Sequence, residues 1–251
     1  MKDKKDFEGL IEYNNSYPDG VPYISIVIAT FNKECLLDKT LASIRANETD
    51  IPYEIIVVDD GSTDNTFDIC KKHQVIYIWL NGGGYRNPAV PRNVGCRTAR
   101  GQILIMQSDD VLHESTDTIA NLTDVQRGEA HFACVWNVDA NRNRLGICNY
   151  KNSSERTNVV AICHPVEEPA AHFFLGSMHK DDFWSIGGND EDFTLPGYED
   201  KYLGELIKRK YKICWRVDVT GLHQDHKRPA NVSGLIHSSH QLYLKKMKEL
   251  E

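Results

Sequence analysis

Residues 102–113 read Gln-Ile-Leu-Ile-Met-Gln-Ser-Asp-Asp-Val-Leu-His, an apolar run that ends in two adjacent carboxylates. A short apolar run of this kind predicts a buried strand of a parallel sheet. Open α/β sheets bind ligands at the carboxyl ends of their strands, which is where Asp109 and Asp110 would lie. Two carboxylates at that place suit a hard cation such as Mg²⁺ or Mn²⁺, particularly one that also holds a diphosphate. The alternative is a solvated acidic turn, and the rest of the chain has to decide between the two.

Strands and helices alternate through the first half of the chain. Strands are predicted at 24–29, 54–58, 75–80 and 102–107, and each of the first three is followed by a helical segment. This alternation predicts the α/β class: a single domain with a mostly parallel central sheet flanked by helices. After residue 113 strands and helices no longer alternate regularly. The last predicted strand is followed by a His-rich loop and a C-terminal helix.

Composition and charge exclude several classes of protein. With 251 residues, 41% apolar and 26% charged, the chain has the make-up of an ordinary globular protein. A net charge of −7 disfavours nucleic acid as a partner. No apolar run approaches the roughly 18 residues of a membrane span, and the charged N-terminus does not resemble a secretory signal, so we expect a cytoplasmic protein. Seven cysteines without a CxxC pair predict small buried hydrophobes, neither a zinc site nor a disulfide framework. The sequence does not indicate an oligomeric state.

Four segments carry acidic residues or histidine at the predicted ends of strands and helices: 59–64, 107–110, 197–200 and 221–226. A parallel sheet gathers such ends along one edge. The four segments could therefore meet in one cleft, which is the usual setting of a ligand site.

From about Ile24 to Arg228 the chain resembles the glycosyltransferases of the GT-A fold, family 2. Each motif is ordinary alone, but their order and spacing make a specific signal. The motifs are Ala29-Thr-Phe-Asn-Lys-Glu34, Val58-Asp-Asp-Gly-Ser-Thr-Asp64, Arg92-Asn-Val-Gly95, Ala99-Arg-Gly101, Ser108-Asp-Asp110, Trp184-Ser-Ile-Gly-Gly188 and Gly197-Tyr-Glu-Asp200.

The resemblance implies a nucleotide pocket. Asp60 matches the position that accepts a hydrogen bond from the base, and Arg92 could reach the nucleotide or its phosphates with its forked donors. Asp59-Asp60 could also serve as a turn and helix cap, and both roles can hold at once; the bland alternative for Arg92 is an exposed charge. The implied nucleotide-binding residues are Thr30, Phe31, Glu34, Asp60, Arg92, Gln107 and Ser108.

The implied metal site departs from the family pattern. Relatives usually carry Asp-x-Asp and bind the metal through its last Asp, whereas here Gln107 stands in the first position. Gln107 could still hydrogen-bond a ribose hydroxyl, but one negative charge is lost. We assign Asp109 to the metal with Asp110 as its rival, and His223 as a second ligand with His226 as its rival. Imidazole plus carboxylate favours Mn²⁺ over Mg²⁺.

The implied chemistry is single displacement with inversion at the sugar carbon. Asp200 would deprotonate the acceptor hydroxyl, and Glu199 would position the acceptor. Simple capping of the predicted helix is the alternative for this pair. Trp184 with Gly187 and Gly188 would form a platform for a sugar ring, unless Trp184 belongs to the core.

The sequence thus predicts a metal-dependent inverting glycosyltransferase with a nucleotide-sugar donor, which we expect to be a UDP-sugar, and a saccharide or another hydroxyl-bearing acceptor. One rival is a sugar nucleotidyltransferase, which would carry a Gly-rich, Arg-containing loop where this chain has Ala29-Thr-Phe-Asn32. The other is a non-catalytic module that binds nucleotide sugars or glycans, against which the intact Glu199-Asp200 pair speaks. We expect an N-terminal arm (1–22), a donor-binding half (23–113), an acceptor-binding and catalytic half (114–237) and a C-terminal helix (238–251).

Overall fold

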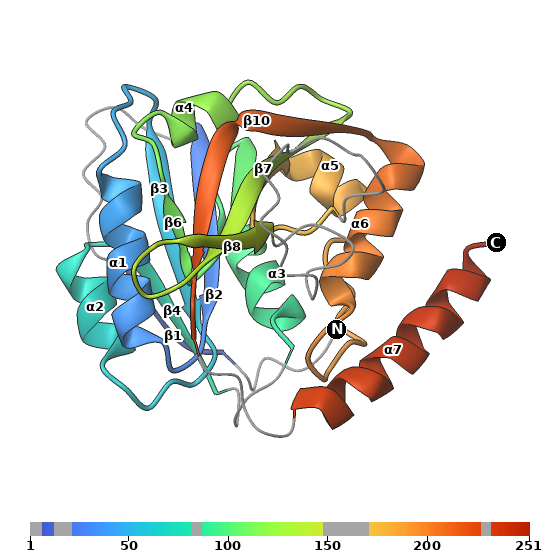
Figure 1. Cartoon of the computed structure of the whole chain (residues 1–251). Helices are drawn as coiled ribbons and strands as arrows, with labels where there is room; N and C mark the ends of the chain where they lie inside the picture. Colours follow the sequence, from blue (N-terminus) through green and yellow to red (C-terminus); the bar gives the residue numbers. More distant parts are fainter. Residues whose placement is uncertain (1–6, 13–21, 82–86, 148–170, 227–231) are drawn as a thin grey trace.

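The structure, a computed structural model, describes residues 7–12, 22–81, 87–147, 171–226 and 232–251 (Figure 1). The strands are β1 (Phe7–Glu12), β2 (Ile24–Thr30), β3 (Tyr53–Asp59), β4 (Ile76–Leu80), β5 (Ile103–Ser108), β6 (Val111–His113), β7 (Glu129–Val138), β8 (Arg144–Ile147), β9 (Leu175–His179) and β10 (Lys212–Gln224). The helices are α1 (Glu34–Arg45), α2 (Thr66–Lys72), α3 (Ala89–Thr98), α4 (Thr118–Leu122), α5 (Lys180–Ser185), α6 (Glu199–Lys210) and α7 (Val232–Glu249).

One sheet of ten strands runs through the described chain in the order β1-β4-β3-β2-β5-β9-β7-β10-β6, and β8 pairs with β7. The pairs β4-β3, β3-β2 and β2-β5 are parallel, as the alternation of strands and helices predicts. Beyond β5 the sheet is mixed, because β9 runs antiparallel to both β5 and β7. The two expected halves therefore share one sheet, and the α/β fold class is confirmed.

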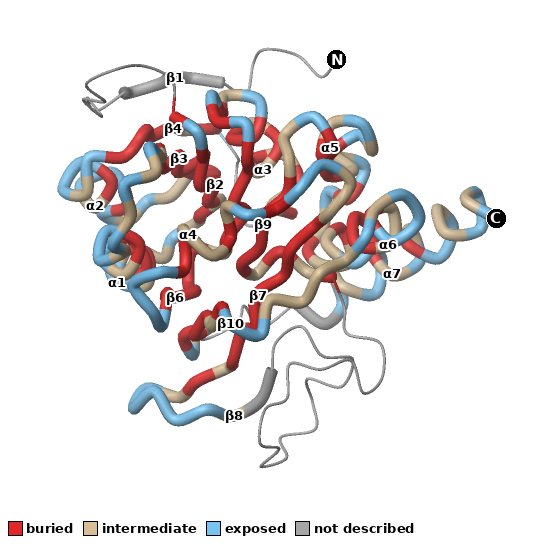
Figure 2. The backbone as a smooth tube through the Cα atoms, turned by 90° about the horizontal axis from the view of Figure 1, so that it is seen from above, coloured by how far each residue is buried: buried red, intermediate tan, exposed pale blue. Residues whose placement is uncertain are grey.

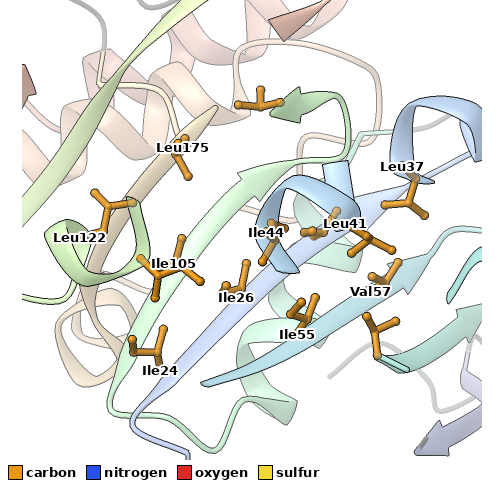
Figure 3. Packing of buried hydrophobic residues seen from close by; sticks show 14 of the residues in the cluster. Ile24, Ile26, Leu37, Leu41, Ile44, Ile55, Val57, Ile105, Leu122 and Leu175 are labelled. Carbon is orange, nitrogen blue, oxygen red and sulfur yellow. The ribbon is translucent and has the colours of Figure 1, made fainter. Parts of the chain in front are cut away.

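Helices cover both faces of the sheet. Alternate residues of β2 point to opposite sides, so Ile26 packs with Leu41 of α1 on one face while Val27 packs with Cys96 of α3 on the other. Figure 3 shows the packing of Ile26 and Leu41 on the first face. Figure 2 shows that the strands are buried between helices whose outer faces are exposed. Since β2, β3 and β5 are buried on both faces, they are continuous apolar runs in the sequence.

Several local predictions need correction. The segment expected as a His-rich loop belongs partly to β10, which runs to Gln224. The C-terminal helix begins at Val232, earlier than expected, and packs on α6 through Tyr243 and Tyr202. Part of the expected N-terminal arm, 7–12, is a strand paired with β4. Cys134 is disulfide-bonded, which the scattered cysteine pattern did not predict.

Candidate active site

A cavity of about 290 Å³ lies at the carboxyl ends of β2, β3 and β5, between them and the start of α6. It is the place where an α/β sheet is expected to bind a ligand. The residues that line it are Ala29, Thr30, Phe31, Lys33, Asp60, Pro88, Pro91, Arg92, Ser108, Asp109, Asp110, Phe174, Pro196, Gly197, Glu199, His223, His226 and Ile236. All four segments singled out in the sequence contribute to this lining.

The acidic pair sits in a tight turn between β5 and β6. Because β6 pairs antiparallel with β10, placing Val111 opposite His223, the turn is held against the end of β10. Asp109 accepts hydrogen bonds from Thr30 Oγ1 at 2.8 Å and from Lys33 Nζ at 3.1 Å. Lys33 Nζ also donates to Asp110 at 2.6 Å. Topology thus brings together carboxylates and a cation that lie far apart in the chain.

Asp110 is the carboxylate that faces the two histidines. Its Oδ1 lies 3.4 Å from His223 Nε2 and its Oδ2 lies 3.1 Å from His226 Nε2. One ligand atom from each of these residues lies within 4.8 Å of the other two. Burial opposes ionisation of Asp110, but its contacts with His223, His226 and Lys33 outweigh burial and hold its pKa well below the usual value. The pKa of Asp109, by contrast, is raised by burial.

The polar atoms of this cluster fit a bound cation. Oδ1 of Asp110 is buried without a hydrogen bond in the described part of the chain. Nδ1 of His223 lies 3.0 Å from Oδ1 of Asn137, an acceptor, so Nδ1 carries a proton and Nε2 of the neutral ring is the atom that can bind a metal. Nε2 lies 3.4 Å from Oδ1 of Asp110, so the two atoms are placed to bind one cation. Nitrogen and oxygen ligands of this kind suit Mn²⁺.

Five of the seven expected nucleotide-binding residues line the cavity: Thr30, Phe31, Asp60, Arg92 and Ser108. Asp59 and Asp60 have different surroundings, one in the turn and one at the cavity, which the sequence allowed. Asp59 accepts from Ser62 N and Tyr77 Oη, both at 2.8 Å, and so holds the turn, while Asp60 faces the cavity.

Glu34 and Gln107 are placed elsewhere, since neither is among the described residues that line the cavity. Glu34 accepts from Asn65 N at 2.6 Å at the start of α2. Gln107 is buried; it donates to Val111 O at 2.6 Å, and its Oε1 lies 2.9 Å from Nε2 of His113, whose pKa burial lowers to about 3. A carboxylate could not donate to Val111, so Gln107 supports the turn that carries Asp109 and Asp110.

Glu199 and Asp200 have different surroundings although they are neighbours at the start of α6. Glu199 lines the cavity and is 5% exposed. It accepts from Asn87 Nδ2 at 2.8 Å and lies 3.5 Å from Arg92 Nη1. Burial, with the charge of Asp200 beside it, raises the pKa of Glu199 to about 7. Asp200 is partly exposed, is not among the lining residues and lies 3.7 Å from His172 Nδ1.

The expected sugar platform is packed against α3. The ring of Trp184 makes an edge contact with Phe183, and the guanidinium of Arg97 lies over it at 5.1 Å. Gly188 has φ +72°, and a Cβ there would lie 2.8 Å from Trp184. Trp184, Gly187 and Gly188 are not among the described residues that line the cavity.

Sequence reasoning missed Lys33, Asn87 and Phe174. Lys33 stands inside the Ala29-Thr-Phe-Asn-Lys-Glu34 motif, and its position two residues after Phe31, which lines the cavity, was an available signal. Phe174 and Asn87 carry no local signal. Only the tertiary structure packs the ring of Phe174 edge-on against His223 in the cavity wall and brings Asn87 to Glu199.

Comparison with known proteins agrees with this geometry. The family model described as Glycosyl transferase family 2 matches residues 25–176, more than half of the chain. The chain belongs to glycosyl transferase family 2. This match includes β2 from Ser25 onward, all of β3 and β5, and the turn that carries Asp109 and Asp110.

Among family relatives, validoxylamine A glucosyltransferase of Streptomyces hygroscopicus subsp. limoneus is 30% identical over 86% of this chain and 55% of the relative. The chain thus spans a little over half the length of that relative. Two solved structures share the fold. Mannosyltransferase PcManGT from Pyrobaculum calidifontis, in complex with GDP-Man and Mn²⁺, has a TM-score of 0.57 and 20% identity over 86% of this chain and 61% of its own. Staphylococcus aureus TarS 1-349 in complex with UDP-GlcNAc has a TM-score of 0.58 and 18% identity over 82% of this chain and 59% of its own.

These likenesses confirm the GT-A fold expected from the sequence. No helix in the described part of this family 2 chain is long and apolar enough to cross a membrane.

Proposed function

We propose that the chain transfers a sugar from a nucleotide-sugar donor, with UDP as the expected nucleotide, to the hydroxyl group of an acceptor. The observation that carries this proposal is the make-up of the cavity wall. Asp60 and Arg92 offer groups for a base and phosphates, and Asp110, His223 and His226 offer a cluster of cation ligands in the same cavity. Relatives solved with GDP-Man and Mn²⁺ or with UDP-GlcNAc support a donor of this class.

The proposed cation is Mn²⁺, held by Asp110, His223 and His226. Bound there, it would neutralise the charge that builds up on the diphosphate as the donor is cleaved. The sequence favoured Asp109 with Asp110 as its rival, but the contacts favour Asp110. Its two oxygens lie 3.4 Å from His223 and 3.1 Å from His226, whereas Asp109 accepts from Thr30 and Lys33.

The reaction we propose is an inverting single displacement. The acceptor oxygen forms a bond to the anomeric carbon, the bond from that carbon to the diphosphate oxygen breaks, and its electron pair stays on the diphosphate. Asp200 takes the proton of the acceptor hydroxyl, and its partly exposed position leaves it accessible to an acceptor. Glu199, anchored by Asn87 and Arg92 in the cavity wall, would position the reacting groups.

The test combines binding and turnover. Release of UDP from UDP-glucose and UDP-GlcNAc should require MnCl2 and stop with EDTA. Asp200→Asn should reduce transfer by roughly a hundredfold to ten-thousandfold, as expected for loss of a general base, and leave the affinity for UDP with MnCl2 nearly unchanged. Equal loss of turnover and UDP affinity would refute the assignment of Asp200 as the base. UDP binding without any release from either donor would favour a non-catalytic binding module.

A further inference from the structure

Lys33 occupies a position in the cavity that its sequence motif did not reveal. It lies directly before α1, lines the cavity, and has a side chain that is 26% exposed. Its ammonium lies 3.1 Å from Asp109 Oδ1 and 2.6 Å from Asp110 Oδ2. The side chains of those carboxylates are only 8% and 3% exposed, so the lysine carries the cationic charge for a nearly buried pair.

The contacts of Lys33 overlap with the cluster of metal ligands. Oδ2 of Asp110 is shared between Lys33 Nζ and His226 Nε2. A divalent cation held by Asp110, His223 and His226 would share the Asp110 carboxylate with the ammonium, and two cations beside one buried carboxylate repel each other. The binding of Mn²⁺ and the present place of Lys33 are therefore in competition.

A second anionic group in the same cavity resolves this competition. The ammonium of lysine is a compact charge on a flexible stem, and it binds phosphate as a point charge. Lys33 and Arg92 line the same cavity, in which the diphosphate of the proposed donor would lie. With Mn²⁺ and the donor bound, the ammonium can turn from the carboxylates to the diphosphate without leaving the cavity.

We propose that Lys33 is an exchangeable cation of the active site: it neutralises Asp109 and Asp110 before Mn²⁺ and the donor bind, and it binds the diphosphate of the donor once Mn²⁺ has taken its place. In the transfer reaction its ammonium would stabilise the diphosphate oxygen that receives the electron pair of the breaking bond. This inference rests on the proposed function, since it requires a nucleoside diphosphate in this cavity.

The inference predicts effects of opposite sign from one substitution. Lys33→Met keeps the length of the side chain and removes its charge. Without nucleotide, Mn²⁺ should bind roughly tenfold more tightly to this variant, because the competing cation is gone. At saturating MnCl2, UDP should bind roughly tenfold to hundredfold more weakly, because a charge-assisted contact is lost, while uridine, which has no phosphate, should bind as before. Titration calorimetry with MnCl2, UDP and uridine measures all three affinities.

Two variants serve as controls. Lys33→Arg retains a cation and should keep the affinity for UDP within about threefold of the wild type, less than half of a tenfold step on a free-energy scale. Lys39→Met removes an exposed lysine of α1 and should change none of the three affinities. A folding defect in Lys33→Met would weaken the binding of uridine as well as that of UDP.

The outcomes separate the two proposals. A wild-type protein that binds neither MnCl2 nor UDP would refute the proposed function. A wild-type protein that binds both, with a Lys33→Met variant that keeps its affinity for UDP or loses affinity for Mn²⁺ and UDP together, would refute the role of Lys33 alone.

Discussion

Strand β10 takes part in two clusters of possible metal ligands, one at each end, and they differ in how their atoms are satisfied. At its carboxyl end, His223 meets Asp110 and His226 in the cavity wall. At its amino end, Cys214 lies opposite His131 of β7, beside Glu129, with one ligand atom of each residue within 4.8 Å of the others.

The amino-end cluster is held in a network of hydrogen bonds and ion pairs. Lys212 Nζ lies 2.7 Å from Glu129 Oε1, His131 Nε2 lies 3.3 Å from Glu129 Oε2, and Arg216 Nη1 lies 3.3 Å from His131 Nδ1. These side chains already provide hydrogen-bond and charge partners for one another.

At the carboxyl end, Oδ1 of Asp110 is buried without a hydrogen bond in the described chain, and a cavity adjoins it. Similar ligand types therefore make a network of hydrogen bonds and ion pairs at one end of the strand and a candidate binding site at the other. What separates them is an unsatisfied buried atom next to open space, because such an atom gains the most from a ligand.

The largest effect expected from this comparison is the loss of the carboxylate. Asp110→Asn should weaken the Mn²⁺-dependent binding of UDP by roughly a thousandfold, more than the 10- to 100-fold that loss of a partner outside the ligand shell costs. Glu129→Gln, its counterpart at the other end, should leave UDP binding unchanged. Titration calorimetry on both variants measures the Mn²⁺-dependent affinity for UDP. Similar losses in the two variants would show that the two clusters do not differ as binding sites.

Glu199 lines the cavity at the carboxyl end of β10, and His131 lies at the amino end; they should give the pH dependence of stability opposite signs. Because burial raises the pKa of Glu199 from its usual 4.5 to about 7, the folded state keeps a proton that the unfolded chain loses. The contribution of Glu199 to the free energy of unfolding therefore declines by roughly 3 kcal/mol as pH rises from about 4.5 to about 7. Burial lowers the pKa of His131 below 6.5, so the unfolded chain binds a proton there more readily than the folded state does. The contribution of His131 to the free energy of unfolding is therefore lost as pH falls below 6.5.

Chemical unfolding at pH 4.5 and pH 8 checks these signs. Glu199→Gln should gain stability relative to the wild type as pH rises, and His131→Gln should gain stability relative to the wild type as pH falls. A difference between Glu199→Gln and wild type that does not depend on pH would contradict the raised pKa of Glu199.

The smallest effect concerns single imidazoles. His223→Ala and His226→Ala should each weaken Mn²⁺ binding by about a hundredfold, less than loss of the carboxylate because a neutral imidazole carries no negative charge. His131→Ala should not change it. Electron paramagnetic resonance of free Mn²⁺ gives the affinities, and an effect of only one of the two substitutions would show which histidine binds the ion.

Sequence patterns were sufficient for the fold and for the position of the site. Continuous apolar runs identify strands buried on both faces, and parallel strands bring their carboxyl ends to one edge, so Asp60 and Asp109-Asp110 could be placed there in advance. Glu34 and Gln107 were expected to contact the nucleotide, but they support α2 and the acidic turn. A motif gives a residue's place in the chain and not the direction of its side chain.

The α/β fold, the family, and the expectation of carboxylates and histidine at the carboxyl edge of the sheet follow from sequence patterns alone. Which of these groups meet depends on the tertiary structure. The antiparallel pairing of β6 with β10 puts Asp110 rather than Asp109 beside His223, and it leaves Lys33 between the two carboxylates. The physical reason is that contacts between residues more than seventy positions apart depend on strand register and turn geometry, which local periodicity does not encode.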